Sequence, residues 1–186
     1  MRSVVIYSSQ TGHTAKYARW IADELGADKF EASDITRKRL RGYDLVIYGG
    51  WLHAGKVKGL GLIKRNLSML REKRVAVFAT GAMPGRPEEI DEVLKRNFSP
   101  DERKFIRFFY LRGGFDFSKL NPRIRLVMRV LKFILEKKKN PTQDEINMIN
   151  AFRNPVDFTR KADIAPIISF ATHAGKHGTS VDHEIE

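Results

Sequence analysis

Short runs of apolar, mostly β-branched residues recur along this chain, and between them apolar residues return at helical spacing. The runs predict buried parallel strands, and the intervening stretches predict helices. Strands are expected at 3–7, 29–31, 45–48, 74–79 and 104–111. Helices are expected at 15–25, 59–69, 87–96 and 160–171, the last with a kink at Pro166. This alternation predicts an α/β fold: a doubly wound, five-stranded parallel sheet with helices on both faces.

A basic segment interrupts the pattern between the fifth strand and the last helix, at about 112–156. Within it, 123–139 predicts a helix whose apolar positions are Ile124, Val127, Met128, Leu131, Ile134 and Leu135. Arg125, Arg129 and Lys132 form a cationic stripe beside them. Such a helix can lie at a membrane interface, or it can pack its apolar face on the domain and leave its charges in water.

The domain organisation follows from the same pattern. Residues 1–172 are expected to form one domain that carries the 112–156 insertion. Residues 173–186 are expected to form a mobile tail. Three of the five histidines, His173, His177 and His183, lie there, but no metal ligand set is visible around them.

Composition narrows the function classes. The 186 residues carry a formal net charge of +12 and contain no cysteine, which excludes disulfides, thiolate catalysis and thiolate metal sites. Neither a signal peptide nor a run of ~18 apolar residues is visible, which predicts a cytoplasmic protein without a spanning helix. The positive charge favours an anionic small molecule or an anionic membrane surface as partner. Nucleic acid is least favoured, since no binding motif accompanies the charge.

The first strand leads into a hydroxyl-rich turn and then a helix, which together predict an anion site. The backbone N–H groups of a helix N-terminus and its dipole converge there, and Ser8, Ser9, Thr11 and Thr14 add hydroxyl donors. The turn lacks the lysine of a P-loop and the three-glycine spacing of a dinucleotide fingerprint. A single phosphomonoester suits it best. The alternative is an ordinary capped helix.

Ser9-Gln10-Thr11-Gly12-His13-Thr14 resembles the phosphate loop of the flavodoxin family, Thr/Ser-x-Thr-Gly-x-Thr, which binds flavin mononucleotide (FMN). The resemblance implies that the phosphate is surrounded by Ser9, Gln10, Thr11, Gly12, His13 and Thr14. The side chain of His13 would either add a charge-assisted contact or face solvent.

Two further turns at the carboxyl ends of the predicted strands, 49–55 and 80–85, stand where such sheets bind ligands. Their glycines permit close backbone approach to a flat ring, and Trp51 could stack on it. Alternatively, the loops are ordinary turns and Trp51 is a core aromatic. The expected flavin contacts are Gly50, Trp51, Leu52, His53, Ala54, Gly55, Thr80, Gly81, Ala82 and Met83. No side chain is assigned a catalytic role.

Over residues 1–172 the chain resembles, more narrowly, the menaquinone-dependent protoporphyrinogen dehydrogenases. The matching segments are 51–56, Arg112-Gly113-Gly114-Phe115 and the inserted helix at 121–139. The resemblance implies an oxidoreductase that passes hydrogen from protoporphyrinogen to FMN and then to a quinone. Expected substrate or membrane contacts are Arg112, Arg123, Arg125, Arg129 and Lys132. Two other hypotheses are a non-enzymatic electron-transfer protein that docks on a redox partner protein, and a flavin-free structural or regulatory domain.

Overall fold

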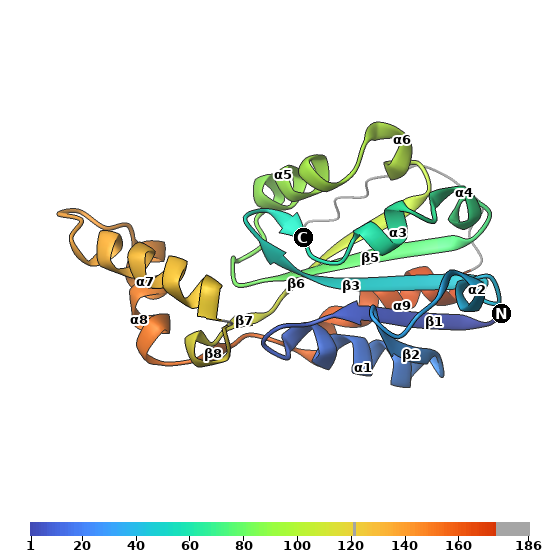
Figure 1. Ribbon diagram of the computed structural model, residues 1–186, viewed down its shortest axis with the longest axis horizontal. Coiled ribbons are helices and arrows are strands. Elements are labelled where there is room, and N and C mark those ends of the chain that lie inside the picture. The colour runs from blue at the N-terminus through green and yellow to red at the C-terminus, as the bar shows by residue number, and fades with distance from the viewer. Residues whose placement is uncertain (121, 174–186) are drawn as a thin grey trace.

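The central sheet has five parallel strands in the order β2-β1-β3-β5-β6 (Figure 1). The structure, a computed structural model, describes residues 1–120 and 122–173; the rest of the predicted tail lies outside these ranges. The strands are β1 (Ser3–Ser8), β2 (Asp28–Glu31), β3 (Leu45–His53), β5 (Arg74–Gly81) and β6 (Ile106–Arg112). A short strand, β4 (Lys56–Val57), pairs antiparallel with the end of β3. This is the strand order of a flavodoxin-like sheet, so the predicted fold class is confirmed.

The register of the sheet brings the carboxyl ends of four strands to one edge. Ser8 of β1 stands opposite Gly50 of β3, and Trp51 stands opposite Thr80 of β5. Gly81 in turn stands opposite Arg112 of β6. The chain starts in the middle of the sheet and reverses its direction of addition between β1 and β3. The crevice beyond these strand ends is therefore the place where such a sheet binds ligands.

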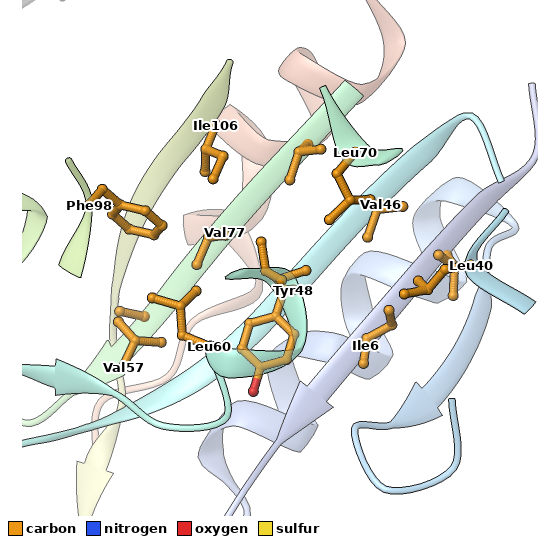
Figure 2. Close-up of a cluster of buried hydrophobic side chains, with 14 of the residues drawn as sticks. Ile6, Leu40, Val46, Tyr48, Val57, Leu60, Leu70, Val77, Phe98 and Ile106 are labelled. Carbon is orange, nitrogen blue, oxygen red and sulfur yellow. The ribbon is translucent and has the colours of Figure 1, made fainter. Parts of the chain in front are cut away.

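Helices cover both faces of the sheet, because alternate strand residues point to opposite sides. One face packs against α1 (His13–Leu25) and α9 (Ala165–Thr172). The other packs against shorter elements: α2 (Arg37–Leu40), α3 (Gly61–Lys64), α4 (Leu67–Leu70), α5 (Pro87–Asn97) and α6 (Pro100–Arg103). Figure 2 shows this second core, in which Tyr48 lies among aliphatic side chains from strands and helices. Both cores hold the strand ends rigidly beneath the crevice.

The insertion forms a helical hairpin that projects beyond the carboxyl edge of the sheet (Figure 1). Its base is a two-stranded antiparallel ribbon of β7 (Gly114–Phe115) and β8 (Val156–Asp157). A 3-10 turn (Phe117–Lys119) leads to α7 (Pro122–Glu136), which is followed by α8 (Gln143–Arg153). The ring of Phe152 contacts those of Phe115 and Phe117, with centroids 5.2 and 5.4 Å apart. These aromatic contacts fix α8 to the base of the hairpin.

Several predicted elements differ from the structure. The helix expected at 59–69 is two separate turns, α3 and α4, and the predicted turn at 49–55 is mostly the extension of β3. Pro166 stands in the first turn of α9, after a 3-10 turn (Lys161–Ile164), where proline is tolerated, so it makes no kink. The second hairpin helix, α8, was not predicted. Within the described ranges, no helix is long and apolar enough to cross a bilayer.

Candidate functional site

The loop between β1 and α1 has the geometry of an anion site. Gly12 adopts a left-handed conformation, with φ of 95°, and turns the chain directly into α1. No side chain in the described part of the chain caps this helix, and its first turn has no acidic residue. The N–H groups of the first turn are therefore left for another acceptor, at the positive end of the helix dipole.

Gln10 gives this loop its clearest sign of a missing polar partner. Both Nε2 and Oε1 of its side chain are buried, and neither has a hydrogen-bond partner among the described residues. An unsatisfied buried polar group costs about 1–3 kcal/mol, so such groups normally meet a ligand or an ordered water. The loop is otherwise tied to itself, since the Ser9 hydroxyl accepts from Gly12 N at 3.2 Å. The residues present fit the phosphate end of an FMN molecule.

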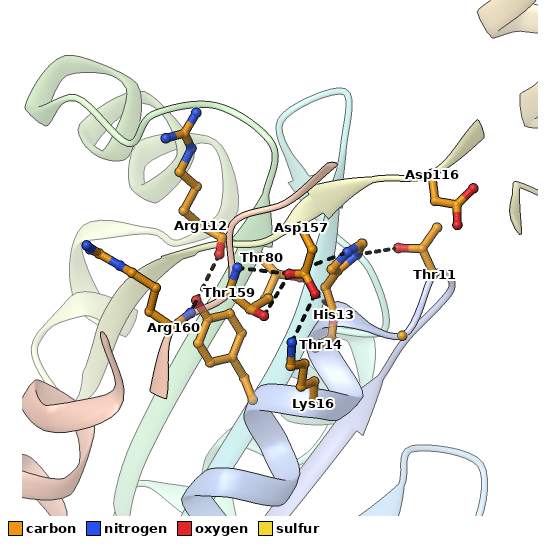
Figure 3. A network of polar contacts seen from close by, with 12 residues as sticks. Thr11, His13, Thr14, Lys16, Thr80, Arg112, Asp116, Asp157, Thr159 and Arg160 are labelled. Carbon is orange, nitrogen blue, oxygen red and sulfur yellow. Dashed lines mark hydrogen bonds and ion pairs between the residues drawn. The ribbon is translucent and has the colours of Figure 1, made fainter. Parts of the chain in front are cut away.

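Thr14 lies deeper than the loop, and its hydroxyl faces the protein interior. Its side chain is buried, and Oγ1 is 2.7 Å from Oγ1 of Thr80, which is buried as well (Figure 3). This hydroxyl pair joins the first turn of α1 to the end of β5. The structure therefore places two of the predicted FMN contacts against each other, beneath the loop.

The side chain of His13 is largely covered, with 13% of its surface exposed. Its Nδ1 lies 2.9 Å from Thr11 Oγ1, and its Nε2 lies 4.0 Å from a carboxylate oxygen of Asp157 in β8 (Figure 3). Burial lowers the pKa of His13, an effect that the Asp157 charge only partly offsets. The contact between Nδ1 and the Thr11 hydroxyl ties the histidine to the loop.

Asp157 and Lys16 close the side of the loop that faces the insertion. Lys16 Nζ donates to Asp157 Oδ2 at 2.9 Å, and Thr159 donates to Oδ1 from its backbone N–H and its hydroxyl. Burial raises the pKa of Asp157, but these hydrogen bonds outweigh it and lower that pKa to about 2. Sequence reasoning did not single out Asp157, although the spacing Asp157-x-Thr159 is typical of a local turn.

The predicted loop after β3 is a tight hairpin. Gly50 lies inside β3, where a Cβ atom would come within 2.5 Å of the Lys58 carbonyl oxygen, so packing explains this glycine. Ala54 and Gly55 form a two-residue turn, both with positive φ, that leads into β4. Trp51 and His53 are both partly buried, and their ring centroids are 5.6 Å apart. Leu52, between them, packs against the core and lies beside Gly81 of the neighbouring strand β5.

Asn97 at the end of α5 holds this hairpin in place. Its Oδ1 accepts from Val57 N at 2.9 Å, and its Nδ2 donates to the carbonyl oxygens of Gly55 and Val93 at 2.8 and 2.7 Å. Asn97 is buried, and each of these partners lies far from it in sequence or belongs to a helix turn. No local signal marks such a residue, and sequence reasoning missed it.

The loop after β5 exposes its tip toward the same crevice. Ala82 and Met83 are exposed, and the Tyr110 hydroxyl donates to the Met83 carbonyl oxygen at 2.9 Å. At the other end of the loop, Gly85 N donates to the Glu89 carboxylate at 3.0 Å. The tip is therefore held from β6 and from the start of α5, with its backbone open to the crevice.

The five predicted cationic contacts do not form one site. Arg112 ends β6 beside the crevice, whereas the other four lie on α7. Arg125 Nη2 donates to the carbonyl oxygens of Ser118 and Leu120, so it supports the hairpin base. Lys132 Nζ lies 3.8 Å from Oε1 of Glu136. Arg123 and Arg129 are exposed.

Comparisons with known proteins identify the family of this chain. Residues 4–142 match the model of the flavodoxin domain family. The chain is similar to the flavodoxin-like domain-containing protein BilS of Clostridioides difficile (strain CD3), with 24% identity over 168 residues, which cover 82% of this chain and 94% of that protein. Solved structures of similar fold include a flavodoxin from the domain Archaea (15% identity, TM-score 0.40, covering 83% of this chain and all of the other). Another is the Trp repressor binding protein of Bacillus subtilis (15% identity, TM-score 0.46, covering 60% and 83%).

Proposed function

Because this chain belongs to the flavodoxin domain family, whose members bind FMN, we propose that it is an FMN-dependent oxidoreductase with an anionic organic substrate and a quinone acceptor. Protoporphyrinogen is the substrate that the resemblance suggests. The observation that carries the proposal is the uncapped start of α1 beside the buried, unpartnered amide of Gln10. Both features call for a polar ligand at the place where the family holds its phosphate.

The chain's own residues would bind and orient the cofactor. The first-turn N–H groups of α1, with the hydroxyls of Ser9 and Thr11, would hold the phosphate by hydrogen bonds. The β3–β4 hairpin and the loop after β5 would hold the ring, with Trp51 as its aromatic neighbour. FMN, when bound, supplies the hydrogen-transfer chemistry. Each pair of electrons and protons removed from the porphyrinogen reduces one quinone to its quinol.

The exposed apolar face of α7 supports a membrane quinone as the electron acceptor. Leu126, Val127, Val130, Phe133 and Ile134 recur at helical spacing, and each side chain is at least 55% exposed. An exposed apolar stripe of this kind on a monomer marks an interaction surface. Its neighbours are cationic: Arg123 and Arg129 are exposed, and Lys137 Nζ lies 4.3 Å from the Phe133 ring centroid. Apolar side chains bordered by cations complement an anionic bilayer, the phase in which a lipid quinone is dissolved.

The first experiment is a titration of the purified protein with FMN, followed by a turnover assay. We expect the flavin absorption bands to shift and to saturate near one FMN per chain. The loaded protein should then oxidise protoporphyrinogen anaerobically and reduce a menaquinone analogue. The Thr11→Val variant should lose FMN affinity, whereas Thr36→Val, which removes the hydroxyl that caps the start of α2, should retain it. A protein that binds no FMN would refute the proposal. One that binds FMN but oxidises no porphyrinogen would favour the electron-transfer protein.

Vesicle flotation tests the membrane surface separately. Replacing Val130 and Phe133 by Asn removes exposed apolar area without touching a core position. We expect the natural chain to float with vesicles rich in phosphatidylglycerol, and more weakly at high salt, because exposed charges are screened. The double variant should remain in solution. Equal flotation of both proteins, or equal binding to vesicles of phosphatidylcholine alone, would contradict the role given to α7.

A further inference from the structure

A separate cavity of about 810 Å³ opens at the β6 edge of the sheet, between the loop after β5 and the segment that precedes α9. Its walls are mixed. Ile90, Tyr110, Phe158 and Pro166 contribute apolar surface, and the guanidinium groups of Arg112 and Arg160 also line the cavity. The cavity adjoins the loop after β5 through Pro84 and Gly85. None of its lining residues belongs to the phosphate loop.

The charges that line the cavity are paired, with one exception. Arg160 Nη2 lies 2.9 Å from Asp163, and Asp157 is bonded to Lys16 at 2.9 Å. Arg112 differs, because its Nε is buried and has no hydrogen-bond partner among the described residues. In Figure 3 the Arg112 side chain points away from the Thr14–Thr80 pair. Among the described residues, Arg112 is therefore the cation in this cavity that has no carboxylate partner.

The position of Arg112 is fixed from two sides. The guanidinium carbon lies 3.8 Å from the centroid of the Phe158 ring, a stacking that suits a planar cation. The Tyr17 hydroxyl donates to the Arg112 backbone carbonyl at 2.8 Å, and Tyr17 O also accepts from Arg160 N at 3.2 Å. Tyr17 is buried beneath both arginines and holds their backbones together. A guanidinium fixed in this way presents its donors without a further ordering cost.

We propose that this cavity binds a carboxylate group of an organic acid with an aromatic ring through Arg112. Parallel N–H donors of a guanidinium match the two oxygens of a carboxylate, and the side chains of Tyr110 and Phe158 can contact an aromatic ring. One carboxylate group matches the single uncompensated cation. A phosphate dianion would instead meet the carboxylates of Asp157 and Asp163, which line the same cavity. The inference rests on the proposed function, since this acid would be its substrate.

The test uses the FMN-loaded protein and two probes, 1-naphthoate and its methyl ester, in calorimetric titrations. We expect naphthoate to bind the natural chain and to bind Arg112→Gln at least about tenfold more weakly, with the ester weak in both. Arg112→Lys keeps the positive charge but loses the two parallel N–H donors of the guanidinium. Its naphthoate affinity should lie between those of the natural chain and Arg112→Gln. Arg37→Gln, which removes an exposed charge on α2, is the matched control and should bind as the natural chain does. FMN titration and thermal melting establish that each variant is folded.

Three results would overturn the assignment: equal naphthoate affinity in Arg112→Gln and the natural chain, an ester that binds as tightly as the acid, or no naphthoate binding at all. The turnover assay separates this site from the proposed function. Naphthoate binding through Arg112 without porphyrinogen oxidation would keep the site and refute the function. Porphyrinogen oxidation with an unchanged KM in Arg112→Gln would keep the function and refute the site.

Discussion

The buried hydroxyl pair of Thr14 and Thr80 permits a quantitative test of how the phosphate loop is attached to the sheet. The two Oγ1 atoms are 2.7 Å apart, and the side chains are 1% and 4% exposed. Thr→Val replaces a hydroxyl by a methyl group of similar size. Each single variant therefore leaves one buried hydroxyl without its partner, whereas the double variant leaves two methyl groups in contact.

The expected magnitudes follow from this geometry. Loss of one partner should lower the free energy of unfolding by about 1–3 kcal/mol, since the remaining hydroxyl stays desolvated. For a chain of this size, about 2 kcal/mol corresponds to a fall in Tm of about 4–8 °C. Replacement of both partners by apolar groups of the same shape should be nearly neutral. Because the double variant avoids both single losses of about 1–3 kcal/mol, the double-mutant cycle should give a coupling free energy of about 2–6 kcal/mol.

Urea unfolding of Thr14→Val, Thr80→Val and the double variant measures this coupling, and FMN titration of the same proteins measures function. We expect the double variant to retain FMN affinity, because the Thr14 hydroxyl points into the protein. Additive losses in the cycle would refute the buried pair. A double variant that is stable but binds FMN tenfold more weakly would show that Thr14 contacts the phosphate, as the motif predicts, and that the pair opens on binding.

Three further outcomes are expected. Asn97→Leu should lower the free energy of unfolding by about 2–3 kcal/mol in urea titrations, because it leaves the buried Val57 N–H unpaired; a loss below 0.5 kcal/mol would contradict this. Gly49→Ala should lower Tm, with a cost of about 1–3 kcal/mol, since its Cβ would lie 2.1 Å from Cζ of the buried Phe78. Because the pKa of His13 is lowered from 6.5, the unfolded chain binds more protons, and stability should fall as pH falls through 6.5. His13→Gln should flatten that slope, and an unchanged slope would refute the assignment.

The sheet could be predicted because its strands carry their own signal. Val4–Tyr7 and 74–79 are apolar runs that only a strand buried on both faces explains, and the structure has both. The boundary of β3 was wrong for a physical reason. Two consecutive glycines indicate a turn, but Gly49 and Gly50 lie inside β3. The Phe78 ring approaches Gly49 and the Lys58 carbonyl oxygen approaches Gly50, so neither position has room for a Cβ atom. Those neighbours are set by packing between segments distant in sequence.

The helix α7 shows what periodicity leaves undecided. Apolar residues cover so much of the helix circumference that they form both a packed face and an exposed face. Leu135 of the predicted face is buried and Met128 is partly buried, but Val127 and Ile134 of the same set are exposed. The sequence contains both faces, and only the position of α8, a helix of weak amphipathic pattern, decides which of them is covered. Likewise, the motif names Thr14 but says nothing of its partner Thr80.

The base of the insertion is the structural link between the phosphate loop and the cavity. Gly113 N donates to the Gly81 carbonyl at the end of β5 at 2.7 Å, and Phe158 N donates to the Gly113 carbonyl at 2.8 Å. The Phe158 ring stacks against the Arg112 guanidinium. The neighbouring residue Asp157 accepts a hydrogen bond from Lys16, which lies beside the phosphate loop. The hairpin that bears the exposed apolar stripe thus starts and ends at this junction. A membrane that binds the exposed apolar stripe of α7 would therefore orient the phosphate loop and the cavity together. Variants in α7 should then change how readily a membrane-bound quinone reaches the site, without changing FMN affinity.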